Sequence, residues 1–287
     1  MFDYHTAFSR NIGWVTPEEQ ATLRSSRVAI AGLGGVGGSH LLTLVRLGIG
    51  AFTIADLDHF ELANFNRQAG ASLKTVGREK VNVLVDMARD INPELDIREY
   101  AGGVDTDNVE DFLDGADIYV DGLDYFAVAA RRTVFASCAT RGVPAVTAAP
   151  LGMGAAVLNF LPGKMTFEEY FQLEGHPESE QLVRFLLGLS PAMLQRKYLV
   201  HPQAVDFIAH QGPSTPMACE ICAGMAATQA LKILLKRGRV MSAPWAQQFD
   251  PYRNKYVRTW RPRGNKNPLQ TIGLVVVRAQ LRKLLKT

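Results

Sequence analysis

The stretch RVAIAGLGGVGGSH, Arg27 to His40, carries the clearest structural pattern in this chain of 287 residues. Its apolar residues 28–31 predict a buried strand, the glycines predict a tight turn, and SHLLTLVRLG predicts a helix. A glycine turn before a helix binds phosphate, because the backbone can approach the anion and unpaired N–H groups point at it. The glycines that would form this cradle are Gly32, Gly34, Gly35 and Gly37. The pattern suits NAD and ATP equally well, and a purely structural turn is the less favoured alternative.

Strands and helices alternate regularly through the first half of the chain. The apolar patterns predict strands at 27–31, 51–56, 95–100, 117–121 and 143–148, and helices at 37–48, about 76–91, 107–113 and 126–141. Alternation of this kind predicts an α/β fold with a doubly wound, Rossmann-like, mostly parallel sheet. Ligands of such sheets bind at the carboxyl ends of the strands.

The second half of the chain is less regular. GAAVLNFLPG predicts another strand, and residues 165–217 predict a helical insertion of short helices separated by Pro and Gly. ICAGMAATQALKILLKRG predicts a long helix that ends before Gly238, and AQQFDPYRNKYVRTW predicts two strands around a turn. IGLVVVRAQLRKLLK is ambiguous between strand and amphipathic helix.

Composition favours a cytoplasmic protein without a membrane partner. The chain is 47% hydrophobic, and it has no run of eighteen apolar residues and no signal-peptide pattern at its start. Its three cysteines, an odd number, fit a reducing compartment.

The net charge of +3 conceals a marked asymmetry. Residues 251–287 contain ten Lys and Arg and no acid, so the first 250 residues carry a net charge of −7. We expect this basic C-terminal tail to dock on its own chain or on a second subunit, or to form a solvated face. Binding to nucleic acid or to an acidic partner is the less favoured alternative.

Polar residues after the second strand favour ATP over NAD. Asp56 lies nineteen positions after Gly37, which suits a ribose hydroxyl of either nucleotide. Behind it come Asn64, Arg67 and Gln68, for which an NAD site has no use.

Two further side chains complete the chemistry of a triphosphate site. Lys80 stands near the start of a predicted helix, and Asp124 follows the strand at 117–121. Arg and Lys neutralise phosphate charge, and a carboxylate at a strand end can hold Mg²⁺. The sequence therefore predicts ATP with Mg²⁺.

Four motifs in this order, GLGGVGG, DLDHFELANFNRQ, VGREKV and VDGLD, resemble the ATP site of the ThiF/MoeB adenylyltransferases of the ubiquitin-activating enzyme superfamily. The resemblance covers about residues 8–160, and the predicted helix 219–237 is similar to a late helix of the family. It implies that a carboxylate attacks the α-phosphate of ATP and gives an acyl-adenylate and pyrophosphate. The implied substrate is the C-terminal glycine of a ubiquitin-like or sulfur-carrier protein, a peptide, a small acid or a modified tRNA base.

The resemblance also implies roles for individual residues. Asp56 would bind the ribose, Arg67 and Lys80 the phosphates, and Asp124 the Mg²⁺. The implied nucleotide-binding set is Gly32, Gly34, Gly35, Gly37, Asp56, Asp58, Asn64, Arg67, Gln68 and Lys80. Arg10 would reach the ATP of a partner subunit, which implies a homodimer.

Some of these polar residues have simpler alternatives. Asp58 could cap a helix, Asn66 could form a turn, and Asp121 could be a solvated strand end. His40 could touch phosphate, but a packed or surface histidine is favoured. The aromatic residues Phe167, Tyr170 and Phe171 have helical spacing, which favours core packing.

The cysteines depart from the pattern of the bacterial relatives, which hold zinc with two CxxC pairs. This chain has one pair, Cys219 and Cys222, so a four-thiolate zinc site is not expected. A thiol at a helix start can have a lowered pKa, and either cysteine could accept an acyl group, with Cys222 as the candidate. Packing or a redox pair is the alternative, and Cys138 is expected in the core.

We divide the chain into an ATP-binding adenylation core with an N-terminal arm (1–164), a helical insertion (165–217), the remainder of the core (218–260) and a basic C-terminal tail (261–287). Two alternative functions remain. One is an NAD-dependent oxidoreductase, and the other is a nucleotide-binding scaffold subunit without catalysis.

Overall fold

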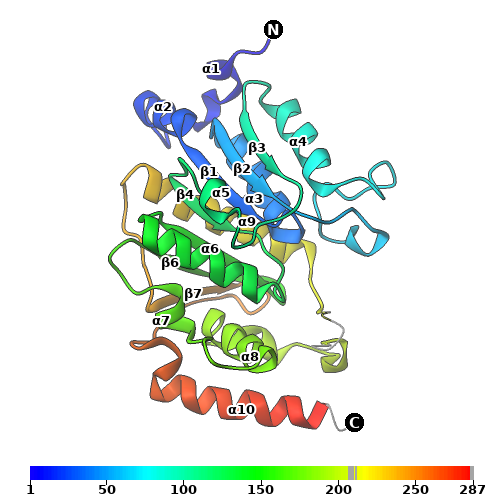
Figure 1. The fold of residues 1–287 in the computed structure, drawn as a ribbon, viewed down its shortest axis with the longest axis vertical. Helices are drawn as coiled ribbons and strands as arrows, with labels where there is room; N and C mark the ends of the chain where they lie inside the picture. Colours follow the sequence, from blue (N-terminus) through cyan, green and yellow to red (C-terminus); the bar gives the residue numbers. More distant parts are fainter. Residues whose placement is uncertain (206–209, 211, 285–287) are drawn as a thin grey trace.

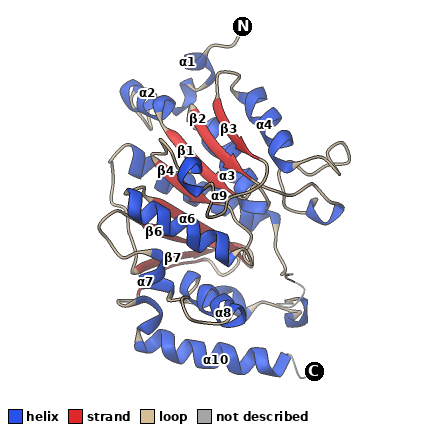
Figure 2. Cartoon of the chain, in the orientation of Figure 1, coloured by secondary structure: helices blue, strands red, loops and turns tan. Residues whose placement is uncertain are grey.

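A single eight-stranded sheet forms the centre of the computed structural model, which describes residues 1–205, 210 and 212–284 (Figures 1 and 2). The strand order is β3-β2-β1-β4-β5-β6-β7-β8. The parallel strands are β1 (Arg27–Ala31), β2 (Ala51–Ala55), β3 (Asp96–Tyr100), β4 (Ile118–Asp121) and β5 (Ala145–Leu151). The antiparallel extension is β6 (Gly154–Phe160), β7 (Trp245–Asp250) and β8 (Lys255–Trp260). The predicted α/β, mostly parallel fold is confirmed.

Helices cover both faces of the sheet (Figure 1). One core joins the sheet to α3 (Gly35–Arg46), α4 (Lys80–Ile91) and α9 (Pro216–Leu234). The opposite core joins it to α5 (Val109–Phe112), α6 (Val128–Arg141), α7 (Phe167–Phe171) and α8 (Glu178–Leu189). The aromatic side chains of α7 are buried there, so the expected core packing is confirmed.

Glycine is required where the loop after β1 meets the loop after β4. Gly32 has φ +83°, and a Cβ on it would lie 2.3 Å from the carbonyl oxygen of Gly122. A Cβ on Gly37 would lie 1.8 Å from the carbonyl oxygen of Gly32. Any side chain at these positions would force the two loops apart.

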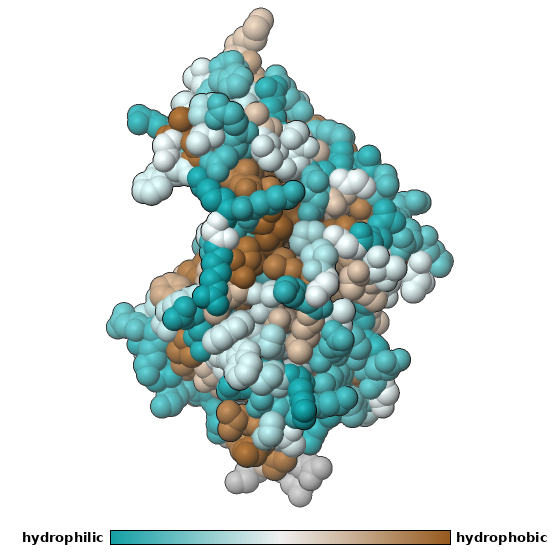
Figure 3. All heavy atoms as spheres, turned by 90° about the vertical axis from the view of Figure 1, so that its left-hand side faces the viewer, coloured by the Kyte–Doolittle hydropathy of each residue, from teal (hydrophilic) through white to brown (hydrophobic). Residues whose placement is uncertain are grey.

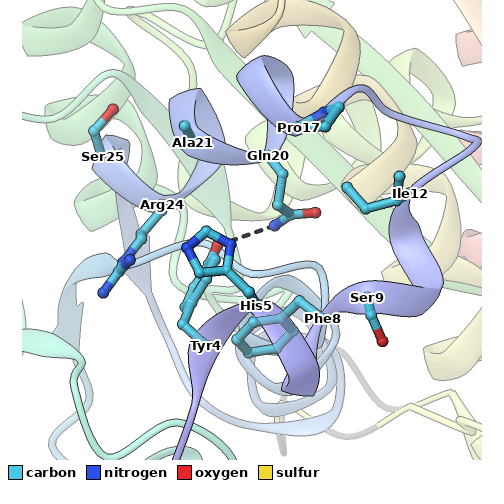
Figure 4. Close-up of a pocket in the computed structure, with 10 residues that line it drawn as sticks. All are labelled: Tyr4, His5, Phe8, Ser9, Ile12, Pro17, Gln20, Ala21, Arg24 and Ser25. Carbon is cyan, nitrogen blue, oxygen red and sulfur yellow. Dashed lines mark hydrogen bonds between the residues drawn. The ribbon is translucent and has the colours of Figure 1, made fainter.

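The N-terminal arm lies at the opposite edge of the sheet from the glycine loop. It comprises α1 (Tyr4–Ala7), a short 3₁₀ turn η1 (Ser9–Asn11) and α2 (Pro17–Ser25). Tyr4 Oη and Asn11 Nδ2 donate to the carbonyl oxygens of Gly48 and Leu47, in the turn that leads into β2. A cavity of about 480 Å³ lies within the arm, between α1 with η1 and α2, where Gln20 donates to Tyr4 (Figure 4).

The basic tail begins as a helix that packs on its own chain. α10 (Pro268–Leu284) lies beside α8 at the lower end of the molecule (Figure 1). Leu274 and Val277 are buried against Val183 and Leu187 of α8. Spacings of three residues on α10 and four on α8 place each pair on one helix face, which resolves the ambiguous segment as a helix.

Several helix boundaries differ from the expected ones, most clearly those at the starts of α4 and α9. α4 begins at Lys80 rather than near 76, because residues before it form turns that end with the backbone N–H of Lys80 donating to the carbonyl of Asp58. α9 begins at Pro216 and includes both cysteines of the CxxC pair. Among the described residues, α9 alone has the length and composition of a membrane-crossing helix, but it packs against α3, β5 and β6 and is a core helix.

His40 of α3 is a packed histidine, as favoured from the sequence. It is 1% exposed, and neither ring nitrogen has a hydrogen-bond partner within residues 1–205, 210 and 212–284. Burial lowers the pKa of His40 to about 4, although the nearby carboxylate of Asp121 acts in the opposite direction. The imidazole is therefore neutral at physiological pH.

This burial predicts a pH-dependent stability. Below pH 6.5 the unfolded chain binds a proton at His40 that the folded chain excludes down to about pH 4, so the free energy of unfolding falls as the pH falls. The slope from this group approaches about 1.4 kcal/mol per pH unit. We expect His40→Leu to show a smaller loss of Tm between pH 7.5 and pH 5 than the wild type. Equal losses in the two proteins would contradict this assignment.

Candidate functional site

Most of the predicted site residues lie around the point where the strand order reverses, between β1 and β4. The loop after β1 contains Gly32 to Gly37, and the loop after β4 contains Gly122 and Asp124. The close contact between Gly32 and Gly122 brings the two loops together. This is the place where open parallel sheets bind their ligands.

Asp56, at the end of β2, holds the glycine loop in place. Its Oδ2 accepts the backbone N–H of Leu33 at 2.6 Å, and its Oδ1 accepts that of Asp58 at 2.8 Å. Burial raises the pKa of Asp56, against the backbone hydrogen bond from Leu33 and the charge of Lys80, which lower it. The carboxylate is thus a structural acceptor, with lone pairs remaining for a ribose hydroxyl.

Lys80, the first residue of α4, forms an ion pair in the site. Its Nζ lies 2.9 Å from Oδ2 of Asp58, and its side chain is 7% exposed against 58% for Asp58. A nearly buried ammonium group needs a charged partner, and here that partner is an exposed carboxylate. Asp58 pairs with Lys80 instead of capping a helix through its side chain.

The segment after β2 places a second cation against the glycine loop. Side-chain atoms of Arg67 and Gln68 would lie 3.4 Å and 3.6 Å from a Cβ on Gly35 and Gly34. The Nη1 of Arg67 donates to Ala63 O and Asn66 Oδ1, and no acid pairs with it in the part of the chain described. The guanidinium can therefore receive an anion.

Two amides of this segment play different parts. Asn64 Oδ1 accepts the backbone N–H of Glu61, so this side chain serves the local turn. Gln68 is 7% exposed, and its Oε1 has no partner among the described residues. Asn66 lies in a turn, as expected, and its side chain also donates to the carbonyl oxygen of Ser214 across the site.

Asp124 is exposed, and its Oδ1 accepts the backbone N–H of Phe126 at 3.0 Å. Its Oδ2 is without a hydrogen-bond partner in residues 1–205, 210 and 212–284 and is an oxygen donor of the kind that Mg²⁺ prefers. No group of three His, Cys, Asp or Glu that could hold a metal occurs in those residues. An ion held by Asp124 would take its other ligands from phosphate and water.

The alternative of a solvated strand end at Asp121 is wrong. Asp121 is 3% exposed and pairs with Arg131 of α6, with Nε of the arginine 2.8 Å from Oδ2 of the aspartate. Arg131 was not among the predicted site residues. The available signal was a basic residue seven positions after Asp124, in the helix that follows the strand.

The two cysteines of the CxxC pair have different surroundings. Cys219 Sγ would lie 3.1 Å from a Cβ on Gly35, whereas Cys222 is fully buried in the core between α9 and the sheet. Burial raises the pKa of Cys219, with Ser214 and Arg67 opposing it, and raises that of Cys222 far more. The lowered pKa expected at the helix start is wrong, because loss of water outweighs the helix dipole. Cys219, not Cys222, lies beside the glycine loop, and Cys138 is in the core as expected.

Arg10 lies on the exposed arm, at the amino edge of the sheet. The glycine loop of the same chain lies at the carboxyl edge. The fold therefore does not bring Arg10 to its own nucleotide site.

Curated relatives align with about half of this chain. A tRNA threonylcarbamoyladenosine dehydratase of Bacillus subtilis is 34% identical over 150 residues, which are 52% of this chain and 57% of that protein. A molybdopterin-synthase adenylyltransferase of Salmonella typhimurium is 32% identical over 143 residues, which are 50% of this chain and 57% of that protein. The chain thus spans a little over half the length of these relatives.

A solved structure extends the likeness of fold over most of the chain. Escherichia coli MccB with ATP has a TM-score of 0.69 and 20% identity, and the match covers 92% of this chain and 73% of MccB. Residues 8–272 match the ThiF family. With its glycine loop, Lys80 and Asp124 gathered at one edge of a Rossmann-like sheet, the chain belongs to the ThiF family.

Proposed function

We propose that this protein uses ATP with Mg²⁺ to adenylate a carboxylate, giving an acyl-adenylate and pyrophosphate. The observation that carries the proposal is the arrangement at the strand-order reversal. There the phosphate-binding loop adjoins Arg67, Lys80 lies close by, and the carboxylate of Asp124 follows the neighbouring strand. Such groups stabilise the negative charge that develops on the leaving pyrophosphate.

The reaction depends on positioning and charge. The attacking carboxylate is already ionised at neutral pH, so no side-chain base is required. The N-terminal N–H groups of α3 and the glycine loop would hold the phosphates, while Arg67 and Lys80 offset the charge that grows on pyrophosphate. A magnesium ion at Asp124 would supply further charge neutralisation on the phosphate oxygens.

The two alternative functions explain less of the site. An NAD-dependent oxidoreductase leaves Arg67, the Lys80–Asp58 pair and Asp124 without a task. An inactive scaffold would not need an unpaired guanidinium beside a phosphate loop. Titration with ATP and Mg²⁺, compared with titration with NADH, distinguishes adenylation from the oxidoreductase alternative. An adenylating enzyme should bind ATP more tightly than NADH.

The fold does not identify which carboxylate is the substrate. The relatives' names span a tRNA dehydratase and a molybdopterin-synthase adenylyltransferase, so several acids deserve testing. The test is substrate-dependent exchange of labelled pyrophosphate into ATP, run with small proteins ending in Gly-Gly, peptides, free acids and modified tRNA. Exchange with none of them would overturn the proposed function.

We also propose a homodimer in which Arg10 serves the partner's ATP. Arg10 is exposed, unpaired among the described residues and remote from its own glycine loop. The face shown in Figure 3 has a hollow with an apolar interior, a surface typical of a protein interface. A second copy is the occupant that would give the arm a function.

Asp124→Ala should abolish pyrophosphate exchange while the fold survives. Asp124 is exposed and makes one side-chain hydrogen bond, to the backbone of Phe126, so its loss removes little structure. We expect a fall of at least about 100-fold in exchange rate and an unchanged Tm. The control is Asp90→Ala, another exposed acid, on α4. Normal exchange in Asp124→Ala would refute the metal assignment.

Two inactive variants should complement each other if Arg10 acts in trans. Arg10→Ala and Asp124→Ala, co-expressed, form mixed dimers in which one site has both groups intact. We expect about a quarter of the wild-type exchange rate from random pairing of the two chains. Activity no higher than that of either variant alone would show that Arg10 does not reach a partner's site.

A further inference from the structure

The side chain of Arg131 on α6 binds the backbone of the loop that carries Asp124. Its Nη2 donates to the carbonyl oxygens of Leu123 at 2.6 Å and Asp124 at 3.1 Å. Its Nε donates to Asp121 at 2.8 Å, and its side chain is 3% exposed. One planar guanidinium thus holds the side chain of Asp121, at the end of β4, and the backbone carbonyls of Leu123 and Asp124.

Asp121, the acid that pairs with Arg131, also accepts hydrogen bonds from residues of the sheet. Asp121 Oδ2 also accepts the hydroxyl of Thr147 on β5, at 2.8 Å. Its Oδ1 accepts the hydroxyl of Tyr119 and the backbone N–H of Leu123, each at 3.2 Å. A buried pair with its remaining lone pairs satisfied is rigid, so the loop has a defined starting point.

The other side of the loop is held by α8, in the helical insertion. The ring of Phe185 lies 4.6 Å from the guanidinium carbon of Arg131, and the hydroxyl of Tyr125 donates to the carbonyl oxygen of Leu182 at 2.6 Å. α8 is in turn packed by α10. The position of the Asp124 loop is therefore set jointly by the sheet and by the insertion.

We propose that Arg131 is a positioning residue that sets the place of the Asp124 carboxylate, and that Phe185 of α8 holds Arg131 in the required orientation. The proposal rests on the proposed role of Asp124. Asp124 is exposed and its carboxylate is held by one hydrogen bond, so its placement depends on the backbone carbonyls that Arg131 binds. A lysine cannot replace Arg131, because a single ammonium cannot reach the carboxylate and both carbonyls in this geometry.

The test compares Arg131→Lys and Phe185→Leu with the wild type. We expect the Mg²⁺ concentration for half-maximal pyrophosphate exchange to rise about tenfold or more, with little change in KM for the carboxylate. Arg132→Lys is the matched control, since the next residue on α6 pairs at the surface with Glu168 and touches no part of the loop. It should leave the Mg²⁺ dependence unchanged.

Hydrogen exchange gives a readout that does not need activity. In Phe185→Leu the amides of residues 122–126 should exchange faster, while those of β1 keep wild-type protection. This measurement also decides the matter if Arg131→Lys does not fold.

Failure of this inference is separable from failure of the proposed function. If the wild type shows no exchange with any carboxylate, the proposed function fails, and loop exchange in Phe185→Leu still tests the positioning. An active wild type with unchanged Mg²⁺ dependence in both variants overturns the inference. Wild-type protection of residues 122–126 in Phe185→Leu overturns it as well.

Discussion

The contact between the backbones of Gly32 and Gly122 is the constraint on which the site depends. Each glycine lies where a Cβ would meet the other loop at 2.3 Å, so the loops after β1 and β4 can approach only without side chains. This approach places a phosphate-binding helix N-terminus beside the carboxylate of Asp124. The strand order, which reverses between β1 and β4, provides the gap into which both loops open.

Two acids near that contact have different partners, one backbone N–H groups and the other a lysine side chain. Asp56 is committed to backbone N–H groups and fastens the glycine loop to β2. Asp58 is exposed and pairs with the nearly buried Lys80. Arg67 has no acidic partner among the described residues. The candidate site thus has one cation whose acidic partner is exposed and a second cation without an acidic partner in the described part of the chain.

Residues outside the nucleotide-binding half also determine the site. α8 contacts the loop of Asp124 through Phe185 and Leu182, and α10 packs behind α8. The insertion and the start of the basic tail thus form one support for the loop that carries Asp124. The tail helix uses its charge in part within the chain, since Arg278 pairs with Glu180.

Local patterns were enough to predict the α/β fold and its mostly parallel sheet, and they indicated candidate nucleotide-binding residues. Glycines before a helix and polar residues after apolar strands have direct physical meanings, and parallel strands bring their carboxyl ends to one edge. What local patterns could not show was which polar groups become buried partners. Asp121 looks like a strand-end acid, yet Arg131 arrives from a helix ten residues away and buries it. The pKa of Cys219 and Cys222 likewise follows from burial among distant residues, which no local pattern encodes. The alternation of strands and helices along the chain thus determined the sheet and the edge at which its candidate site residues lie. Packing between distant segments determined the burial, ionisation and orientation of individual side chains, because these depend on neighbours in space.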